Sequence, residues 1–357
     1  MNSVQQFTVT VTHVRAMPDI LSFQAALDDS RRLERKHLLL GNGFSIACKA
    51  DIFQYGRLFE RADFQALSVG ARAAFDTFST QDFERIIKSL RDTRAVLRGY
   101  GGVDAALMER LEHDASGLRE VLLQTIAGSH PARPSDVTDA EYESCRRFLA
   151  SFERIYTLNY DLLMYWAQMH EPSDIQLTHD DGFRKPEDEA DAPYVTWDSS
   201  GSDSQSTFYL HGGLHIVDTG TEIQKLTWAN TGVALIDQIQ AALNTDNYPL
   251  FVSEGTAREK LTRIKHSDYL SRSLRSLREI QGGLFLYGVS MSENDDHVLK
   301  TIERGKIGAL YVGIYGDQKS AANREVIRRS TQLAESRPHA KPMSVVFYSA
   351  ESAHVWR

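Results

Sequence analysis

Glycine and polar side chains follow the ends of apolar runs at four places in this sequence. In an open parallel sheet, ligands bind in the crevice beyond the carboxyl ends of the strands, so residues that close such runs are the first candidates for chemistry. The four segments are Gly41-Asn42-Gly43-Phe44-Ser45, Asn159-Tyr160-Asp161, His211-Gly212-Gly213 and Gly288-Val289-Ser290.

The first segment predicts a site for phosphate. Glycines at positions 41 and 43 let the backbone approach an anion closely, and the N–H groups at the start of a following helix point toward it. We therefore expect the five residues Gly41, Asn42, Gly43, Phe44 and Ser45 to hold the pyrophosphate of a dinucleotide. A plain tight turn stays open as an alternative, because the G-x-G-x-x-G fingerprint is incomplete. The absence of a G-x-x-x-x-G-K-[ST] loop argues against an ATPase or kinase of that class.

The second and third segments supply side chains suited to catalysis. Asn159 offers an amide and Asp161 a carboxylate, although both could instead cap the following helix. His211 carries an imidazole, which is a natural general base near neutral pH, and its flanking glycines are expected to keep it accessible. A lone histidine is more often structural, so that interpretation also stays open.

The fourth segment offers contacts for a sugar or a phosphate. Gly288 and Ser290 can form hydrogen bonds to a ribose or phosphate through the backbone and the hydroxyl. Asn294 and Asp295 follow closely, and capping of a helix is the simplest role for them.

The apolar runs themselves predict a parallel sheet. They are rich in β-branched residues, end in glycine, asparagine, histidine or serine, and alternate with helical patterns, as β-α-β construction requires. We expect an α/β fold, a Rossmann-like doubly wound and mostly parallel sheet. The predicted strands are 37–40, 154–158, 207–210, 248–252, 283–287, 309–314 and 343–348.

More than a hundred residues separate the first two predicted strands, which is too many for one crossover helix. Apolar residues at helical spacing within this stretch, as in 83–90 and 114–127, predict a helical insertion over residues 60–150 that caps the sheet. The acidic run 187–203 has the composition of a surface loop. No linker divides the chain, so residues 1–357 are expected to form a single domain.

Composition excludes several classes of protein. The net charge of −8 argues against a large basic face for nucleic acid. Two cysteines, Cys48 and Cys145, form no CxxC pair, which leaves no disulfide framework or cysteine zinc site and points to a reducing compartment. No signal core or membrane-spanning stretch is visible, so a cytoplasmic protein is expected.

Taken in order, the four segments resemble a known family. Gly-x-Gly, then Thr-x-Asn-x-Asp, then His-Gly, then Gly-x-Ser is the order found in sirtuins. The sequence resembles most the bacterial sirtuin-like NAD hydrolases of antiphage defence, in a branch catalogued only as a domain of unknown function. Segments that fit this branch are 39–47, 249–256 with Lys260 and Tyr269, 288–297 and 347–352.

This resemblance implies an NAD+ hydrolase that cleaves the nicotinamide–ribose bond and depletes NAD+ during phage infection. It implies catalysis by Asn159 and His211, support from Asp161, and nucleotide contacts in the Gly41–Ser45 turn and at Gly288 and Ser290. The zinc-ribbon cysteines and the Asp-Phe-Arg element of deacetylating sirtuins are missing, so lysine deacylation is not expected. No metal or cofactor beyond NAD+ as substrate is implied.

Two other classes of function are compatible with parts of the sequence. The same pocket could bind NAD+ or ADP-ribose as a signal without cleaving it, and a nucleic-acid-associated role would rest only on scattered basic clusters. Residues 253–256 could contact ligand or another subunit, or simply begin a helix. Because an unrestrained NAD hydrolase would kill its host, we expect control by homo-oligomerisation or by a separate activating or sensor protein.

Overall fold

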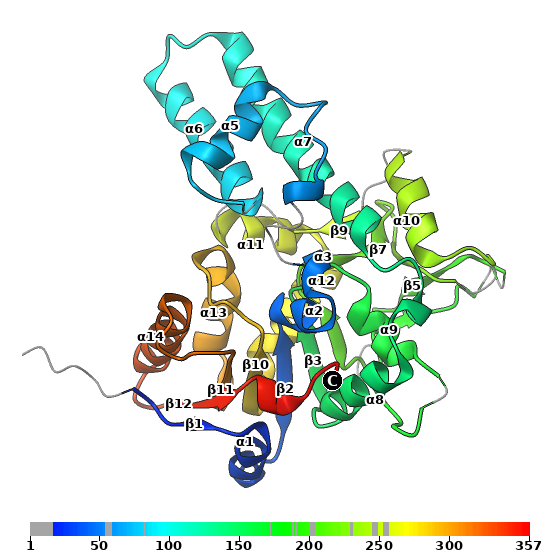
Figure 1. The fold of residues 1–357 in the computed structure, drawn as a ribbon, viewed down its shortest axis with the longest axis vertical. Coiled ribbons are helices and arrows are strands. Elements are labelled where there is room, and N and C mark those ends of the chain that lie inside the picture. Colours follow the sequence, from blue (N-terminus) through cyan, green and yellow to red (C-terminus); the bar gives the residue numbers. More distant parts are fainter. Residues whose placement is uncertain are drawn as a thin grey trace, which may run out of the picture.

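A seven-stranded parallel sheet forms the centre of the computed structural model (Figure 1). The structure describes residues 17–357, except 54–58, 82, 172, 188, 190, 200–203, 229–230, 245–248 and 253–256. In order across the sheet, the strands are β1 (Ile20–Leu21), β12 (Ser344–Ser349), β11 (Lys306–Ile314), β10 (Gln281–Tyr287), β2 (Lys36–Leu40), β3 (Arg154–Thr157) and β6 (Thr207–Tyr209). Every neighbouring pair is parallel, which confirms the predicted α/β fold.

Both faces of this sheet are covered by helices. On one face, Phe285 contacts the ring of Phe23 from helix α1 (Phe23–Asp29), which in turn packs against Phe148 from α8 (Asp139–Leu149). On the other face, the Tyr156 hydroxyl lies 2.8 Å from Ser276 Oγ of α12 (Asp268–Glu279). The sheet is therefore doubly wound, and its strands are buried on both sides as their apolar runs predict.

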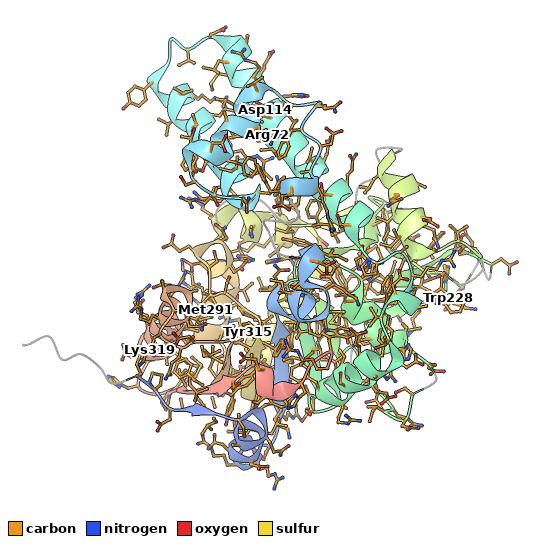
Figure 2. All side chains as sticks on the ribbon, viewed as in Figure 1. Arg72, Asp114, Trp228, Met291, Tyr315 and Lys319 are labelled. Atoms are coloured by element: carbon orange, nitrogen blue, oxygen red, sulfur yellow. The ribbon has the colours of Figure 1, made fainter. Side chains whose placement is uncertain are left out.

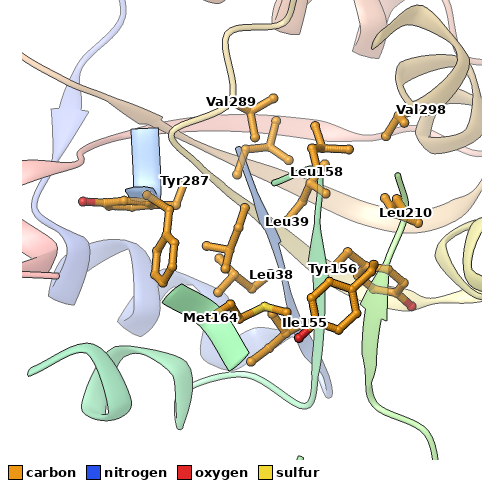
Figure 3. Packing of buried hydrophobic residues seen from close by; sticks show 14 of the residues in the cluster. Leu38, Leu39, Ile155, Tyr156, Leu158, Met164, Leu210, Tyr287, Val289 and Val298 are labelled. Carbon is orange, nitrogen blue, oxygen red and sulfur yellow. The ribbon is translucent and has the colours of Figure 1, made fainter. Parts of the chain in front are cut away.

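Further helices lie beside the parallel sheet. Helix α9 (Leu163–Met169) places Met164 beside the central strands (Figure 3). Short helices α2 (Gly43–Cys48) and α3 (Ala50–Phe53) follow β2 directly. The remaining helices beside the sheet are α11 (Ala257–His266), α13 (Asp296–Glu303) and α14 (Ala321–Glu335).

The predicted insertion is helical and contains two different parts. Helices α5 (Val69–Thr77), α6 (Phe83–Tyr100) and α7 (Ala105–Ser129) form a lobe that projects beyond the sheet (Figure 1). Asp114 lies inside this lobe (Figure 2), where its Oδ1 accepts a hydrogen bond from the Ser68 amide at 2.9 Å. Helix α8 also falls within residues 60–150, but it covers the main sheet rather than extending the lobe.

A second, five-stranded antiparallel sheet was not anticipated. Its order is β4 (Phe183–Arg184), β5 (Tyr194–Trp197), β8 (Ile223–Leu226), β7 (Gly212–Asp218) and β9 (Pro249–Phe251), with α10 (Leu235–Asn244) beside it. The prediction of a parallel strand over 248–252 was wrong, because β9 pairs antiparallel with β7. Within the described part of the acidic run 187–203, β5 replaces part of the expected loop.

The end of the described chain returns to the beginning of the sheet. Strand β12 pairs with β1, and beyond the short helix η4 (Glu351–Ala353) the indole of Trp356 packs on Phe44. The Trp356 Nε1–H donates to the Phe44 carbonyl oxygen at 3.1 Å. Among the described residues, no helix is both long enough and apolar enough to cross a membrane.

Candidate functional site

A cavity of about 740 Å³ lies at the carboxyl ends of the parallel strands. Because these strand ends share one edge of the sheet, segments far apart in the sequence meet there. Predicted site residues that line the cavity are Gly41, Asn42, Gly43, Asn159, Asp161, His211, Gly288 and Ser290. Phe44 and Ser45 do not line it, and both are fully buried.

The glycine turn is packed against a second backbone. An added Cβ on Gly41 would lie 2.5 Å from the Gly288 oxygen, and one on Gly43 would lie 2.5 Å from the Gly288 Cα. The amides of Gly41 and Gly43 donate to Tyr287 and Gly288 carbonyl oxygens, each at 3.0 Å. These glycines therefore have a structural requirement that is independent of any ligand.

The same bonding limits the amides left for an anion. The Phe44 amide donates to the Gly41 oxygen at 2.9 Å, so three of the five amides expected to bind pyrophosphate already have acceptors. Among the described residues, only the amides of Asn42 and Ser45 in this turn have none. The Asn42 side chain points back into the protein, since its Nδ2 donates to the Phe53 oxygen at 3.1 Å.

A short chain of hydrogen bonds joins the first two predicted segments. The Asn159 Nδ2 donates to Ser45 Oγ at 2.9 Å and to the Gly41 oxygen at 3.1 Å, and Ser45 Oγ donates to Asp161 Oδ2 at 2.5 Å. No group in the described part of the chain donates to Asn159 Oδ1. The network thus fixes the Asn159 amide through its nitrogen and leaves its oxygen for a ligand or water.

Asp161 supports this arrangement from inside the protein. Its Oδ1 accepts the Leu163 amide at 2.9 Å, so it does cap the first turn of α9, one of the two roles considered for it. Burial raises the pKa of Asp161, while hydrogen bonds from Ser45 and Leu163 act in the opposite direction. The Asp161 side chain therefore positions Ser45 and the start of α9, and it is not available as a general acid for a ligand.

His211 is enclosed rather than accessible. Its side chain is 2% exposed, and Gly212, with φ of +79°, allows β9 to approach where a side chain would overlap the Leu250 carbonyl. Gly212 therefore serves the pairing of β7 with β9, and the expectation that the flanking glycines keep the imidazole accessible was wrong. Burial lowers the pKa of His211 well below its usual range, and the Lys260 and His297 charges add to this effect. The ring is neutral at pH 7.

The His211 ring contacts a histidine that the sequence did not single out for chemistry. His211 Nε2 lies 2.9 Å from His297 Nε2 and 4.0 Å from Asp295 Oδ1, which is itself 3.6 Å from the Lys260 Nζ. Asp295 makes no side-chain hydrogen bond to the start of α13, so its predicted capping role is not the one seen. Asn294 is not the capping residue either, because Ser292 Oγ caps the short helix Glu293–Asp295 by accepting the Asn294 amide at 3.3 Å.

The fourth segment forms a tight loop beside the glycine turn. Gly288 has φ of +67°, and its own Cβ would lie 2.5 Å from Gly43 Cα, so both backbones need glycine here. Ser290 is exposed and lines the cavity. Met291 has φ of 56°, which is uncommon for a residue other than glycine, and such strained residues gather at functional sites.

Two groups of residues line the cavity that were not predicted from the sequence. Tyr315, Asn323 and Glu325 line the cavity after β11, and Asn323 Nδ2 donates to the Tyr315 oxygen at 2.8 Å (Tyr315 is labelled in Figure 2). The strand-end rule applies equally at Ile314 and would have found Tyr315, whereas Asn323 and Glu325 belong to α14 and follow no strand end. The second group is apolar and comes from α3 and the helical lobe, namely Phe53, Phe83, Leu122 and Ile126.

His130 holds the loop that carries Asn159 and Asp161. Its Nδ1–H donates to the Pro131 oxygen at 3.0 Å, which leaves Nε2 without a proton to accept the Leu162 amide at 3.1 Å. Burial lowers the pKa of His130 to about 4. Protonation of Nε2 would break the bond to Leu162 and loosen the loop.

We expect this histidine to make stability depend on pH. The folded pKa of His130 lies below the ordinary value of about 6.5, so the unfolded chain binds more protons in between, and stability is lost as the pH falls from 6.5 toward 4. For one such group the loss between pH 7 and pH 5 is about 2 kcal/mol. In urea unfolding, the free energy of unfolding of His130→Gln should fall between pH 7 and pH 5 by about 2 kcal/mol less than that of the wild type. The exposed control His339→Gln should show the same fall as the wild type. Equal falls in all three proteins would contradict the assignment.

Residues 253–256, considered for ligand or subunit contact, lie outside the described residues. His215, four positions beyond His211, belongs to β7 and is fully buried against the rings of Tyr165 and Tyr209. It is therefore unsuitable as a neutral control for His211.

The fold and the cavity define the class of protein: a doubly wound α/β protein with a large cavity at the carboxyl ends of its parallel strands. Residues 38–356 match the family model described as Domain of unknown function (DUF4917). The chain belongs to this family. None of the curated proteins matches the sequence.

Solved structures of Sir2 homologues are similar to the chain at low identity. One is a complex with NAD, with 10% identity and a TM-score of 0.34, covering 90% of this chain and 97% of that one. Another is an ADP-ribose complex of a histidine-to-asparagine mutant, with 12% identity and a TM-score of 0.34, covering 88% of this chain and 97% of that one. At these values no residue role is transferred by superposition.

Proposed function

We propose that this protein is an NAD+ hydrolase that cleaves the bond between nicotinamide and ribose to give nicotinamide and ADP-ribose. The observation that carries the proposal is the meeting of all four predicted segments at one cavity of about 740 Å³. Pockets for small molecules and cofactors have volumes of a few hundred to a thousand Å³. The sirtuin-like order of the segments supports NAD+ as the ligand, and the likeness to defence NAD hydrolases supports a role in depleting NAD+ during phage infection.

Hydrolysis of the nicotinamide–ribose bond requires few catalytic groups from the protein. As the N-glycosidic bond breaks, its electron pair moves to the ring nitrogen of the cationic nicotinamide, which leaves as a neutral molecule. The ribose carbon acquires oxocarbenium character, and a water oxygen attacks it while one proton is released. Neither a strong general acid nor a metal is required.

The protein must bind the nucleotide, position the attacking water and stabilise the reacting sugar. We assign the first to the Asn42 amide together with the loop at Gly288 and Ser290. The Asn159 Oδ1, which no described group occupies, accepts a hydrogen bond from the attacking water. The neutral His211 ring accepts from a ribose hydroxyl.

The direct test is incubation of the purified chain with NAD+, followed by chromatography of nicotinamide and ADP-ribose. Equimolar release of both products, persisting in a metal chelator, would support hydrolysis. Tight binding of ADP-ribose with no release of nicotinamide under any condition would instead favour a protein that senses the nucleotide without cleaving it.

We further expect the isolated protein at low concentration to be a weak hydrolase. Because an unrestrained NAD+ hydrolase would harm its host, control is expected to come from self-association or from a separate protein. The rate per molecule should rise with protein concentration or on addition of a partner encoded beside it. Full turnover by a dilute monomer, unchanged over a hundredfold range of concentration, would contradict this expectation.

A further inference from the structure

A second cavity, of about 330 Å³, lies at the amino ends of the parallel strands, at the opposite edge of the sheet from the larger cavity. Arg154, the first residue of β3, lines it, whereas Asn159, five positions further on, lines the larger cavity. An extended chain spans at most about 3.6 Å per residue, so roughly 18 Å separates these two residues at most. The two cavities share no lining residue and are separate sites.

One face of helix α12 supplies most of the polar lining of this second cavity. Arg272, Arg275, Ser276 and Glu279 are spaced i, i+3, i+4 and i+7, which places them on one side of the helix. Arg154 reaches the same place from β3, because its Nη1 donates to Ser276 Oγ at 3.1 Å. Three guanidinium groups from two elements therefore line one cavity.

These positive charges are not balanced within the cavity. Glu279 is the only carboxylate among the described residues that line it, and it forms an ion pair with Lys306. Neither Arg154 nor Arg275 pairs with a carboxylate in the described part of the chain. Like charges at this spacing repel one another, so the cavity favours an anion although the whole chain has a net charge of −8.

The Arg154 charge also acts on the neighbouring strand. His37 of β2 is paired with Arg154 in the register of the sheet. Burial lowers the pKa of His37 to about 4, its contact with the Gln281 carbonyl opposes this effect, and the Arg154 charge lowers the pKa further. The amino edge of the sheet is thus a region of positive potential.

We propose that this cavity is a second binding site, for a small molecule that carries a phosphate or diphosphate group. A guanidinium presents paired N–H donors that match two oxygens of a phosphate, so three of them at one cavity suit an anion with two or more charges. The volume is near the lower end of the range for small-molecule pockets, about 300–1,000 Å³. Because no residue of the larger cavity lines it, the bound molecule is an accessory ligand and not the substrate.

Calorimetry of the full chain with inorganic pyrophosphate tests the site. Arg275→Gln is the informative variant, because the Arg275 side chain is exposed and forms no hydrogen bond or ion pair in the described part of the chain, so the fold does not depend on it. Loss of a hydrogen bond between charged groups weakens binding by about tenfold to a hundredfold, and we expect a loss of this size. Arg275→Lys, which keeps the charge without the paired donors, should recover part of the affinity.

Arg278→Gln is the matched control. Arg278 is also an exposed arginine of α12, but it does not line the cavity, so this variant should bind pyrophosphate as the wild type does. An equal loss in Arg278→Gln and Arg275→Gln would show only the effect of total charge and would overturn the proposal. A wild type that binds pyrophosphate no more tightly than Arg275→Gln would overturn it as well.

A comparison of probes identifies the source of the phosphate group. Inorganic phosphate, pyrophosphate and ADP are titrated in turn, and only binding that Arg275→Gln removes is assigned to this cavity. Tighter binding of ADP than of pyrophosphate would identify a nucleotide as the ligand, and equal binding would identify an inorganic anion, and both outcomes support the site. Binding of acetate as tight as that of pyrophosphate would overturn the preference for phosphate. None of these measurements requires release of nicotinamide, so the result is independent of the proposed hydrolysis.

Discussion

Replacing His211 with alanine is expected to lower the rate of NAD+ cleavage by about a hundredfold to ten-thousandfold, with little change in the affinity for ADP-ribose. The neutral, enclosed ring contributes most when charge develops on the sugar, so its loss affects the transition state more than the ground state. Chromatography of nicotinamide under activating conditions measures the rate, and calorimetry with ADP-ribose measures the affinity.

Asn159→Ala should produce a loss of similar size for a different reason. It removes the amide oxygen assigned to the water, and it also removes the hydrogen bonds to Ser45 and Gly41, so its stability must be measured alongside. The exposed His339→Ala is the matched control for the histidine and should keep the wild-type rate. If His211→Ala hydrolysed NAD+ as fast as the wild type, the catalytic assignment would be wrong.

Gly43→Val is expected to lower both stability and NAD+ binding. The new Cβ would lie 2.5 Å from Gly288 Cα, where neither backbone can move without separating β2 from β10. Overpacking of this kind costs about 1–3 kcal/mol, and the shift would also displace both loops that line the cavity. Urea unfolding measures the first effect, and calorimetry of the folded fraction measures the second.

Gly99→Val is the matched control for this substitution. Gly99 lies in α6, and an added Cβ there would meet nothing within 4 Å. The variant should therefore keep the wild-type affinity and nearly the wild-type stability. Undiminished NAD+ binding by folded Gly43→Val would show that the turn is not part of the nucleotide site.

The parallel sheet was predictable because its strands are buried on both faces. Runs such as Leu38-Leu39-Leu40 carry no polar face, and their long separations leave room for crossover helices. The antiparallel sheet was missed for the opposite reason. Four of its five strands have only two to four residues, and the β8 run Ile223-Gln224-Lys225-Leu226 does not alternate apolar with polar residues, so no period of two is visible there.

The part of the site that directly follows the strand ends could be predicted from the sequence. Glycine and polar residues after apolar runs identified eight cavity-lining residues, because the carboxyl ends of parallel strands converge. The partners of those residues could not be found in this way. His297 ends an acidic segment that is typical of a helix start, and its contact with His211 spans 86 residues and depends on how α13 packs. The apolar residues of the lobe that line the cavity likewise follow no strand end, so this signal could not identify them.

The bond between Trp356 and Phe44 joins residues 312 positions apart. On the ribosome, Phe44 is made early and its support beside the glycine turn arrives only after almost all of the described chain has been translated. Strand β1 must likewise wait for β12. For the NAD+ hydrolase proposed above, activity in nascent chains would be harmful, and this late closure would separate synthesis from activity in time. We expect chains that end before Trp356 to lack the closing contact and to release no nicotinamide.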